Sequence, residues 1–209
     1  MADKKPMASG QITFVQELMR KGTHMGALII PAGYYFLHLE RPEMLSIMVP
    51  VTVAMILIDI ARLRRWLFWK AFARKILSPV IRQHEMAGDF TGATYILLSV
   101  CLTVALYDKP IAIAAIAFII VGDTLAALIG RRFGRHRFGN KSVEGSLACL
   151  AGTVIVAVIV PDLPIGIRLF GAVVATIVEA LPLGIDDNIT VPILSGLSMT
   201  LLDKTLISF

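Results

Sequence analysis

Cysteine and charge are both scarce in this sequence of 209 residues. Its two cysteines, Cys101 and Cys149, lie in apolar runs, and their spacing matches neither a disulfide framework nor a metal-binding motif. Charged residues make up only 17% of the chain and hydrophobic residues 56%, whereas an ordinary soluble domain is about 45–50% apolar. The composition therefore argues against a soluble globular domain and favours a polytopic membrane protein with short loops.

Other common features are missing as well. The polar N-terminal segment, residues 1–20, has no apolar core followed by a small-residue cleavage site, so we expect no removable signal peptide there. The chain shows no internal repeat, which disfavours a transporter because many transporter folds are built from repeats. The net charge of +5 indicates basic cytoplasmic loops on a membrane protein, and we predict no nucleic-acid partner.

Long apolar stretches dominate the rest of the chain. A helix needs about 20 apolar residues to cross a bilayer, and the candidate spans are residues 24–39, 44–61, 91–107, 111–130, 144–160, 165–183 and 191–208. The first of these is short and contains Pro31 and Gly33. The sequence predicts an all-α, polytopic integral membrane protein in which residues 21–209 form a single membrane-embedded domain of about seven transmembrane helices.

A basic segment with both tryptophans of the chain separates the second and third predicted spans. Five of its apolar residues recur at helical spacing: Leu63, Trp66, Leu67, Leu77 and Ile81. A basic amphipathic helix of this kind lies in the plane of the membrane surface. We predict an interfacial helix, which either anchors the chain or shapes a path by which lipid enters.

Lysine and arginine are distributed unevenly between the two ends of the predicted spans. If the N-terminus is cytoplasmic, all but four of the 20 basic residues fall on the cytoplasmic side, and the four are Arg41, Lys109, Arg168 and Lys204. The positive-inside rule predicts this orientation, with the C-terminus outside. Acidic residues then also gather at cytoplasmic helix ends, among them Glu144, Glu179, Asp186 and Asp187.

Asp123 lies inside the fourth predicted span, roughly 10 Å below its cytoplasmic end at Gly130. Ala126, Ala127 and Gly130 share its helix face, at spacings of three, four and seven residues. Such a face of small residues lets another helix or a ligand approach closely. Since a carboxylate at depth in a membrane is costly and is usually functional, we predict that Asp123 belongs to a site.

The loop after this span combines glycines with positive charge. Gly130, Gly134 and Gly139 allow backbone amides to turn toward an anion. Arg131 and Lys141 belong to a run of basic residues that either neutralises phosphates or only fixes the orientation of the chain. "KSVEGS" then opens the next helix, whose N-terminus is itself an anion site. The loop is not a Walker A motif, because Asn140 stands where that motif requires glycine.

These residues form a pattern that resembles a known family. The central stretch reads D-x-x-A-x-x-x-G-R-x-x-G from Asp123 to Gly134, and then K-S-x-E-G-S from Lys141 to Ser146. It resembles the CTP-dependent lipid alcohol kinases (dolichol kinase, phytol kinase and CTP-type diacylglycerol kinase) of the broader phosphatidate cytidylyltransferase-like superfamily. "RKGTH" at residues 20–24 and "EALPLGIDDNITVP" at residues 179–192 are also similar to stretches of that family.

The resemblance implies transfer of the γ-phosphate of CTP to the hydroxyl of a lipid alcohol, with Mg²⁺ or another divalent cation as cofactor. Residues 21–209 are then a membrane-embedded kinase domain with its active site at the cytoplasmic face. The implied catalytic residues are Asp123, Lys141 and Glu144. The implied nucleotide- and phosphate-binding residues are Arg20, Lys21, His24, Gly130, Arg131, Gly134, Lys141, Ser142 and Ser146. The implied metal ligands are Asp123, Asp186 and Asp187, and further candidates are Glu179 and Asn188.

Several roles stay open at this point. Asp123 either binds the metal or accepts the proton of the lipid hydroxyl. His24 either orients a phosphate or is an interfacial histidine, and Glu144 caps its helix, binds metal or orients Lys141. For Glu179, polar packing competes with a functional role.

Two other functions are alternatives to the kinase. One is a cytidylyltransferase, in which a lipid phosphate attacks the α-phosphate of CTP, although the signature of CDP-diacylglycerol synthases is absent from this sequence. The other is an anion transporter. No residue pattern identifies cytosine, the oligomeric state, or which of polyprenol, phytol and diacylglycerol is the lipid.

Overall fold

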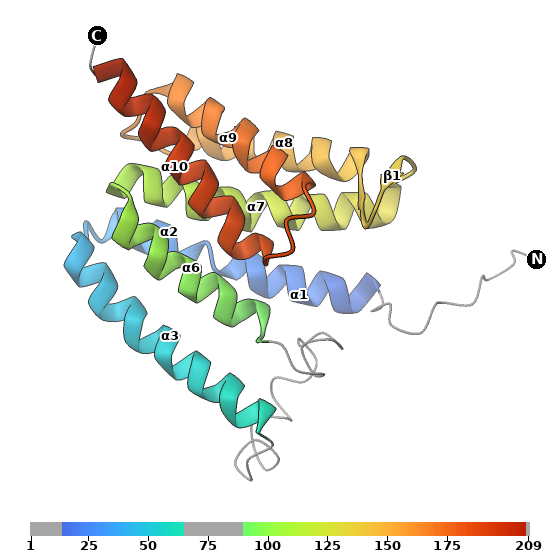
Figure 1. Ribbon diagram of the computed structural model, residues 1–209, viewed down its shortest axis with the longest axis horizontal. Helices are drawn as coiled ribbons and strands as arrows, with labels where there is room; N and C mark the ends of the chain where they lie inside the picture. The colour runs from blue at the N-terminus through green and yellow to red at the C-terminus, as the bar shows by residue number, and fades with distance from the viewer. Residues whose placement is uncertain (1–13, 65–89, 208–209) are drawn as a thin grey trace, which may run out of the picture.

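The computed structural model describes residues 14–64 and 90–207, and these are almost entirely helical (Figure 1). The first range contains α1 (Phe14–Gly26), α2 (Ile29–Phe36) and α3 (Arg41–Leu63). The second contains α6 (Gly92–Leu106), α7 (Lys109–Phe133), α8 (Val143–Ile159), α9 (Ile165–Ala180) and α10 (Asp187–Ile207). The all-α class is confirmed. Nearly all of the predicted interfacial helix lies outside the described residues.

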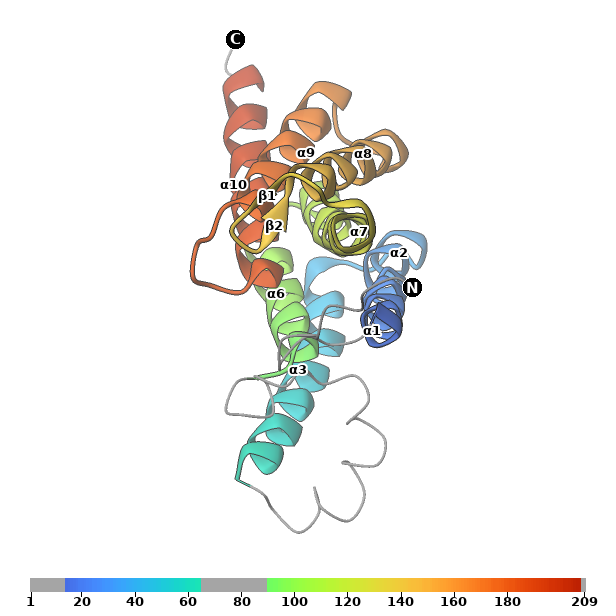
Figure 2. The same ribbon diagram turned by 90° about the vertical axis from the view of Figure 1, so that its right-hand side faces the viewer.

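The central element of the described structure is α7. It contacts α1, α2, α6, α8, α9 and α10, and two views show it between the α1–α2 pair and the group formed by α8, α9 and α10 (Figures 1 and 2). Every residue from Ile111 to Ile120 is buried, as expected for a helix that is apolar all round. Asp123 follows within one turn, so the core helix itself carries the predicted site carboxylate.

Small residues allow α7 and α8 to pack closely. A Cβ atom added to Gly145 would lie 2.9 Å from the carbonyl oxygen of Ala126 and 3.3 Å from the Cα of Gly130. A Cβ atom at Gly152 would lie 2.6 Å from Leu125 Cδ1. The small face predicted beside Asp123 is therefore occupied, at Ala126 and Gly130, by the neighbouring helix.

The predicted apolar stretches from residue 44 onward correspond to single helices. α3 and α6 to α10 each cover one stretch, with ends that differ by a few residues. Stretch 24–39 does not form one helix, because α1 ends at Gly26 and a turn at Ala27 and Leu28 precedes the short α2. α1 also begins at Phe14, inside the segment expected to be a polar N-terminal region.

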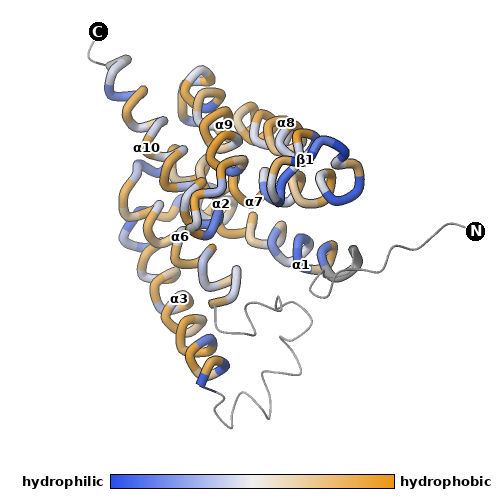
Figure 3. Tube along the Cα trace, turned by 45° about the vertical axis from the view of Figure 1, so that its right-hand side comes forward, coloured by the Kyte–Doolittle hydropathy of each residue, from blue (hydrophilic) through white to orange (hydrophobic). Residues whose placement is uncertain are grey.

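Two described helices, α3 and α7, are long and apolar enough to cross a membrane, and α6 and α8 are shorter apolar helices. Figure 3 shows hydrophobic positions along α3, α6 and α7 and hydrophilic positions along α1 and around β1. α3 exposes large apolar side chains, including Ile47, Val51 and Leu57. A face of this kind suits contact with lipid better than contact with water.

A short hairpin joins α7 to α8. β1 (Arg137–Phe138) pairs antiparallel with β2 (Lys141–Ser142), so that Phe138 lies opposite Lys141. Gly139 and Asn140 form the turn, and Gly139 has a φ of +57°. Glycine adopts this left-handed conformation without steric cost and is favoured at such turns. The predicted loop is therefore a defined structure that fixes the position of Lys141.

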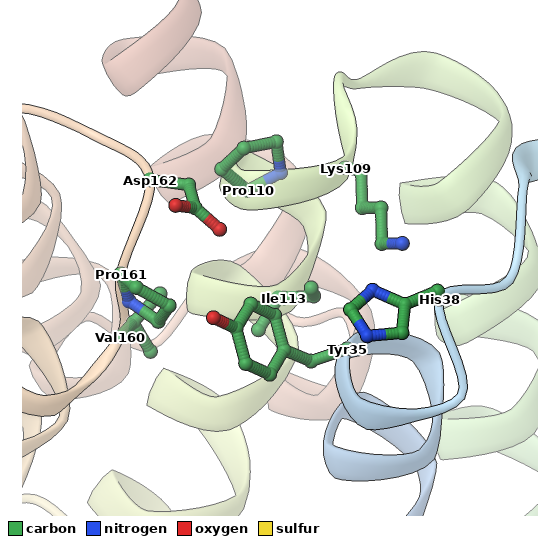
Figure 4. Close-up of a pocket in the computed structure, with 8 residues that line it drawn as sticks. All are labelled: Tyr35, His38, Lys109, Pro110, Ile113, Val160, Pro161 and Asp162. Carbon is green, nitrogen blue, oxygen red and sulfur yellow. The ribbon is translucent and has the colours of Figure 1, made fainter.

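A small polar cavity lies at the other end of α7. It measures about 170 Å³ and is lined in part by Tyr35, His38, Lys109 and Asp162 (Figure 4). His38 and Asp162 have φ values of 52° and 63°, and they are the two non-glycine residues with positive φ in the described ranges. No residue predicted to belong to the kinase site lines this cavity.

Candidate active site

Four polar residues of α1 share one side of the helix. Glu17, Arg20, Lys21 and His24 are separated by three, four and seven residues, which places them on one helical face. Glu17 and Lys21 are buried although both carry charge. Because a buried charge needs a partner, this face is held against α7 by ion pairs.

Asp123 is the point where α1 and α7 meet. Its carboxylate accepts a hydrogen bond from Lys21 Nζ, although the two residues are 102 positions apart in the chain, and the Lys21 side chain is fully buried. His24 Nε2 lies 3.4 Å from the same carboxylate oxygen. That nitrogen is buried and has no hydrogen-bond partner. Three predicted site residues therefore converge, and one of them has an unsatisfied polar atom that a ligand can use.

Glu17 is a member of this cluster that the sequence analysis does not identify. Its carboxylate accepts a 2.5 Å hydrogen bond from Arg20 and lies 3.5 Å from the guanidinium of Arg131. The predicted phosphate-binding residues Arg20 and Arg131 are thus held by one buried acid. The signal for Glu17 in the sequence is its position, one turn before Arg20 and Lys21 on the same face.

Lys141 is the centre of a second cluster. Its ammonium group lies 3.1 Å from Glu179 of α9 and 3.1 Å from Asp187 of α10. Although burial lowers the pKa of Lys141, attraction to the two carboxylates outweighs it and raises the pKa above the usual value. Lys141 therefore remains a cation at neutral pH, as a phosphate contact requires.

The two clusters are close enough to interact electrostatically. Burial raises the pKa of Asp187 above its usual value, Lys141 offsets part of this increase, and the carboxylates of Asp123 and Asp186 raise it further. Asp123 thus acts on a residue of the second cluster. The site combines charged groups from α1, α7, β2, α9 and α10, which are separated widely in the sequence.

Ser142 and the predicted phosphate-loop glycines form a packed corner. Ser142 Oγ accepts a 3.1 Å hydrogen bond from the amide of Gly145 and so caps α8. A Cβ atom at Gly130 would lie 3.0 Å from this oxygen, and one at Gly134 would lie 2.7 Å from it. Both glycines therefore allow α7 to end against the start of α8. Their use in binding phosphate stays a prediction.

Glu144 and Ser146 lie in the first turn of α8 and differ in their contacts. Glu144 accepts hydrogen bonds from the backbone amide of His136 and lies 2.8 Å from the imidazole of the same residue. In this structure it braces the hairpin. The Ser146 hydroxyl is buried without a hydrogen-bond partner, so it remains free to contact a ligand.

The two adjacent aspartates at the start of α10, Asp186 and Asp187, make different contacts. Asp186 Oδ1 accepts hydrogen bonds from the backbone amide and the side-chain amide of Asn188, at 2.9 Å and 2.7 Å. The carbonyl oxygen of the Asn188 side chain is buried and has no partner. Asp187 instead contacts Lys141. Asp187 faces the second cluster, whereas Asp186 stabilises the start of α10.

A cleft of about 420 Å³ opens beside Lys141 and Asp187. One wall is the hairpin, with Phe138, Gly139 and Asn140, and the other is the segment 181–185 between α9 and α10. Its volume falls in the range of about 300–1,000 Å³ that is common for small-molecule sites. Phe138 and this second wall are further residues that the motif did not identify.

The predicted metal ligands do not form a preassembled cage. Within the described residues, no group of three or more His, Cys, Asp or Glu side chains is arranged to hold a metal ion. Glu179 and Asp187 both contact the ammonium of Lys141 in this structure. Mg²⁺ usually takes one or two carboxylates and completes its shell with phosphate and water oxygens, so a metal site at these residues stays a prediction.

Comparison with known proteins shows that the chain is similar in sequence to lipid kinases. No protein-family model matches the chain, and no solved structure gives a significant match. The chain is 25% identical to CTP-dependent diacylglycerol kinase 1 of Saccharomyces cerevisiae, over 94% of this chain and 77% of that kinase. It is 35% identical to a phytol kinase of Synechocystis, over 57% of this chain and 58% of that enzyme. It is also 28% identical to an uncharacterized protein of Rickettsia prowazekii, over 88% of this chain and 94% of that protein.

The curated relatives with a named activity are CTP-dependent diacylglycerol kinases and phytol kinases. Both are kinases of lipid alcohols, and they support the CTP-dependent lipid alcohol kinase family. The resemblance based on the central motif is therefore confirmed. Together with the apolar helices, these relatives indicate a membrane protein.

Proposed function

We propose that the chain is a membrane-embedded kinase that transfers the γ-phosphate of CTP to the hydroxyl of a lipid alcohol, either a polyprenol, phytol or diacylglycerol, at the cytoplasmic interface. The observation that carries the proposal is the meeting of Lys21 and His24 of α1 with Asp123 of the core helix, together with the cluster of Glu179 and Asp187 around Lys141. The names of the relatives favour kinase chemistry over cytidylyl transfer.

In this proposal the lipid hydroxyl oxygen attacks the γ-phosphorus of CTP. The bond from that phosphorus to the β–γ bridging oxygen breaks, CDP leaves, and the hydroxyl proton passes to Asp123. Lys21 and Lys141 stabilise the negative charge of the phosphates, which is the main requirement of phosphoryl transfer. His24 Nε2, which is buried 3.4 Å from Asp123 and has no hydrogen-bond partner, is proposed to donate a hydrogen bond to the transferred group.

A divalent cation, Mg²⁺ in the simplest case, neutralises phosphate charge when it is bound. Asp187 is the ligand that the geometry favours, because it already contacts a cation beside the cleft. Asp123 is the second candidate. Asp186 is the weakest of the three predicted ligands, since one of its two carboxylate oxygens already accepts two hydrogen bonds from Asn188.

The proposed membrane arrangement follows the sequence. It has about seven membrane crossings, of which the first is assigned to the broken pair α1 and α2 because stretch 24–39 does not form one helix. The N-terminus is then cytoplasmic and the C-terminus external. The site then lies at the cytoplasmic end of α7. The water-soluble nucleotide reaches it from the cytoplasm and the lipid alcohol reaches it from the bilayer.

The decisive experiment uses CTP labelled at one phosphate at a time. The purified protein is incubated with a total lipid extract and either γ-labelled or α-labelled CTP, and the labelled lipid is identified by mass. We expect only the γ label in lipid. Transfer of the α label identifies a cytidylyltransferase, and the absence of both labels from lipid refutes lipid phosphorylation.

A further inference from the structure

The cleft beside Lys141 is built from two distant parts of the chain that are both shaped at glycines. The hairpin turns at Gly139 and the opposite wall turns at Gly184, with φ values of +57° and +72°. These are the two glycines with positive φ in the described ranges. Each wall therefore adopts a turn that other residues accommodate poorly, and together the walls enclose a cavity of about 420 Å³.

The lining of this cleft combines apolar, amide and charged residues. The second wall supplies Leu181, Pro182, Leu183 and Ile185, and the hairpin supplies the ring of Phe138. Asn140 adds an amide, and Lys141 and Asp187 add opposite charges at the side shared with the second cluster. This lining suits a ligand that carries both a flat, weakly polar part and a strongly anionic part.

We propose that this cleft holds the nucleoside part of the phosphoryl donor, with Phe138 stacking on the pyrimidine base and Asn140 hydrogen-bonding to the edge of the base. The inference rests on the proposed function and deepens it, since the central motif accounts for the phosphates and not for the base. The Asn140 side chain can accept from the exocyclic amine of cytosine and donate to its ring nitrogen at the same time.

The position of Lys141 in the cleft agrees with a nucleotide bound there. Lys141 lines the cleft and lies 3.1 Å from both Glu179 and Asp187. A nucleotide whose base lies against Phe138 can therefore place its phosphates at Lys141, which pairs with Phe138 across the hairpin. Phe138 is 41% exposed without a ligand, which leaves its ring available for stacking.

The test compares two probes, CTP and inorganic tripolyphosphate, which differ by the nucleoside. Equilibrium binding of each probe to the full chain in detergent is measured for Phe138→Ala, Phe138→Trp and Asn140→Ala. Since stacking on one aromatic side chain is worth at least a fivefold change in affinity, we expect Phe138→Ala to weaken CTP binding by at least fivefold and to leave tripolyphosphate binding unchanged. Phe138→Trp should retain CTP affinity, and Asn140→Ala should weaken CTP alone.

Phe133→Ala is the matched control, because Phe133 is exposed at the end of α7 and does not line the cleft. Equal affinities for CTP in the wild type and Phe138→Ala overturn the proposal, as does a parallel loss of both probes, which indicates a damaged hairpin. A changed KM for the lipid with unchanged CTP affinity also overturns it and assigns the cleft to lipid. If the Phe138 effect on CTP is seen but no lipid is phosphorylated, the cleft assignment stands and the kinase proposal fails.

Discussion

Asp59 and Asp123 are two aspartates placed in apolar helices, each with a basic partner, and their surroundings differ. Asp59 of α3 accepts hydrogen bonds from Arg62, from the backbone and hydroxyl of Thr91, and from the hydroxyl of Thr94. Its side chain is 1% exposed. Asp123 of α7 accepts from Lys21, has His24 at 3.4 Å and is 19% exposed.

The two sites differ in how many polar atoms remain without a hydrogen-bond partner. One oxygen of Asp59 accepts from Arg62 of the same helix, and the other accepts from Thr91 and Thr94 at the start of α6, so that carboxylate has a complete structural role. Around Asp123 a carboxylate remains partly accessible, and His24 keeps a buried nitrogen without a partner. Complete satisfaction indicates a structural acid, and incomplete satisfaction of a partly accessible carboxylate favours a functional one.

The largest expected effect is on the turnover of an Asp123 variant, which tests whether Asp123 is functional or only structural. Asp123→Asn should lower turnover by at least the ~10²-fold typical of removing a general base. Because the ammonium of Lys21 is fully buried, the same change should also cost about 3–5 kcal/mol of stability. The double variant Lys21→Met with Asp123→Asn should recover thermal stability and remain inactive. Near-native turnover in either variant would make Asp123 a packing residue.

Asp59→Asn should give the opposite result. Removal of the charge that neutralises buried Arg62 is expected to destabilise the protein by about 3 kcal/mol, while turnover per folded molecule stays within about twofold. The measurement is thermal unfolding and activity in the same detergent. Thr94→Val, which removes one neutral donor to Asp59, should cost only about 1 kcal/mol. A loss of turnover at unchanged stability would bring Asp59 into the active site and end the comparison.

Lys141→Ala probes the second cluster. A hydrogen bond to a charged group contributes about 1.5–3 kcal/mol, so affinity for CTP should fall by roughly 10- to 100-fold. Arg135→Ala is the control, because Arg135 is an exposed basic residue of the same connection between α7 and α8. Equal losses in both variants would show that only the overall positive charge matters.

The cysteine-labelling variants are expected to change activity least, because they test only the orientation of the chain in the membrane. A cysteine at Arg135 should react only with cytoplasmic reagent and a cysteine at Lys109 only with external reagent, in a chain whose partly buried Cys101 is replaced by alanine. In the proposed orientation Asp59 and Asp123 both lie near the cytoplasmic side. The difference between them is then due to their contacts, since both lie on the same side of the membrane. Labelling of both positions from one side would reject the proposed orientation.

The apolar helices could be predicted from the sequence because their signal is local. α3 and α6 to α10 follow from runs of hydrophobic residues bounded by Pro, Gly and charge. α1 could not be predicted in this way, since its buried face is charged and depends on Asp123 and Arg131 of another helix. The break at Ala27 was missed because the apolar run continues through it.

Several residues of the candidate site could be predicted from the sequence, but the contacts between them could not. The motif identified Asp123 and Lys141, yet no pattern indicates that Lys21 pairs with Asp123 while Lys141 turns to Glu179. These choices arise from packing between segments far apart in the chain. The cleft was hidden for the same reason, because its walls are two turns that meet only after folding.

The ion pair between α1 and α7 also has a consequence for how the protein is made. Synthesis proceeds from the N-terminus, so Lys21 has already emerged when the segment of α7 enters the bilayer. An aspartate at the centre of an inserting helix raises the free energy of insertion by about 2.5–3.5 kcal/mol. A counter-ion that is already present at the membrane surface reduces this cost during insertion. We therefore expect α1 to assist the integration of α7, so that loss of Lys21 should leave part of the newly made chain with α7 outside the membrane.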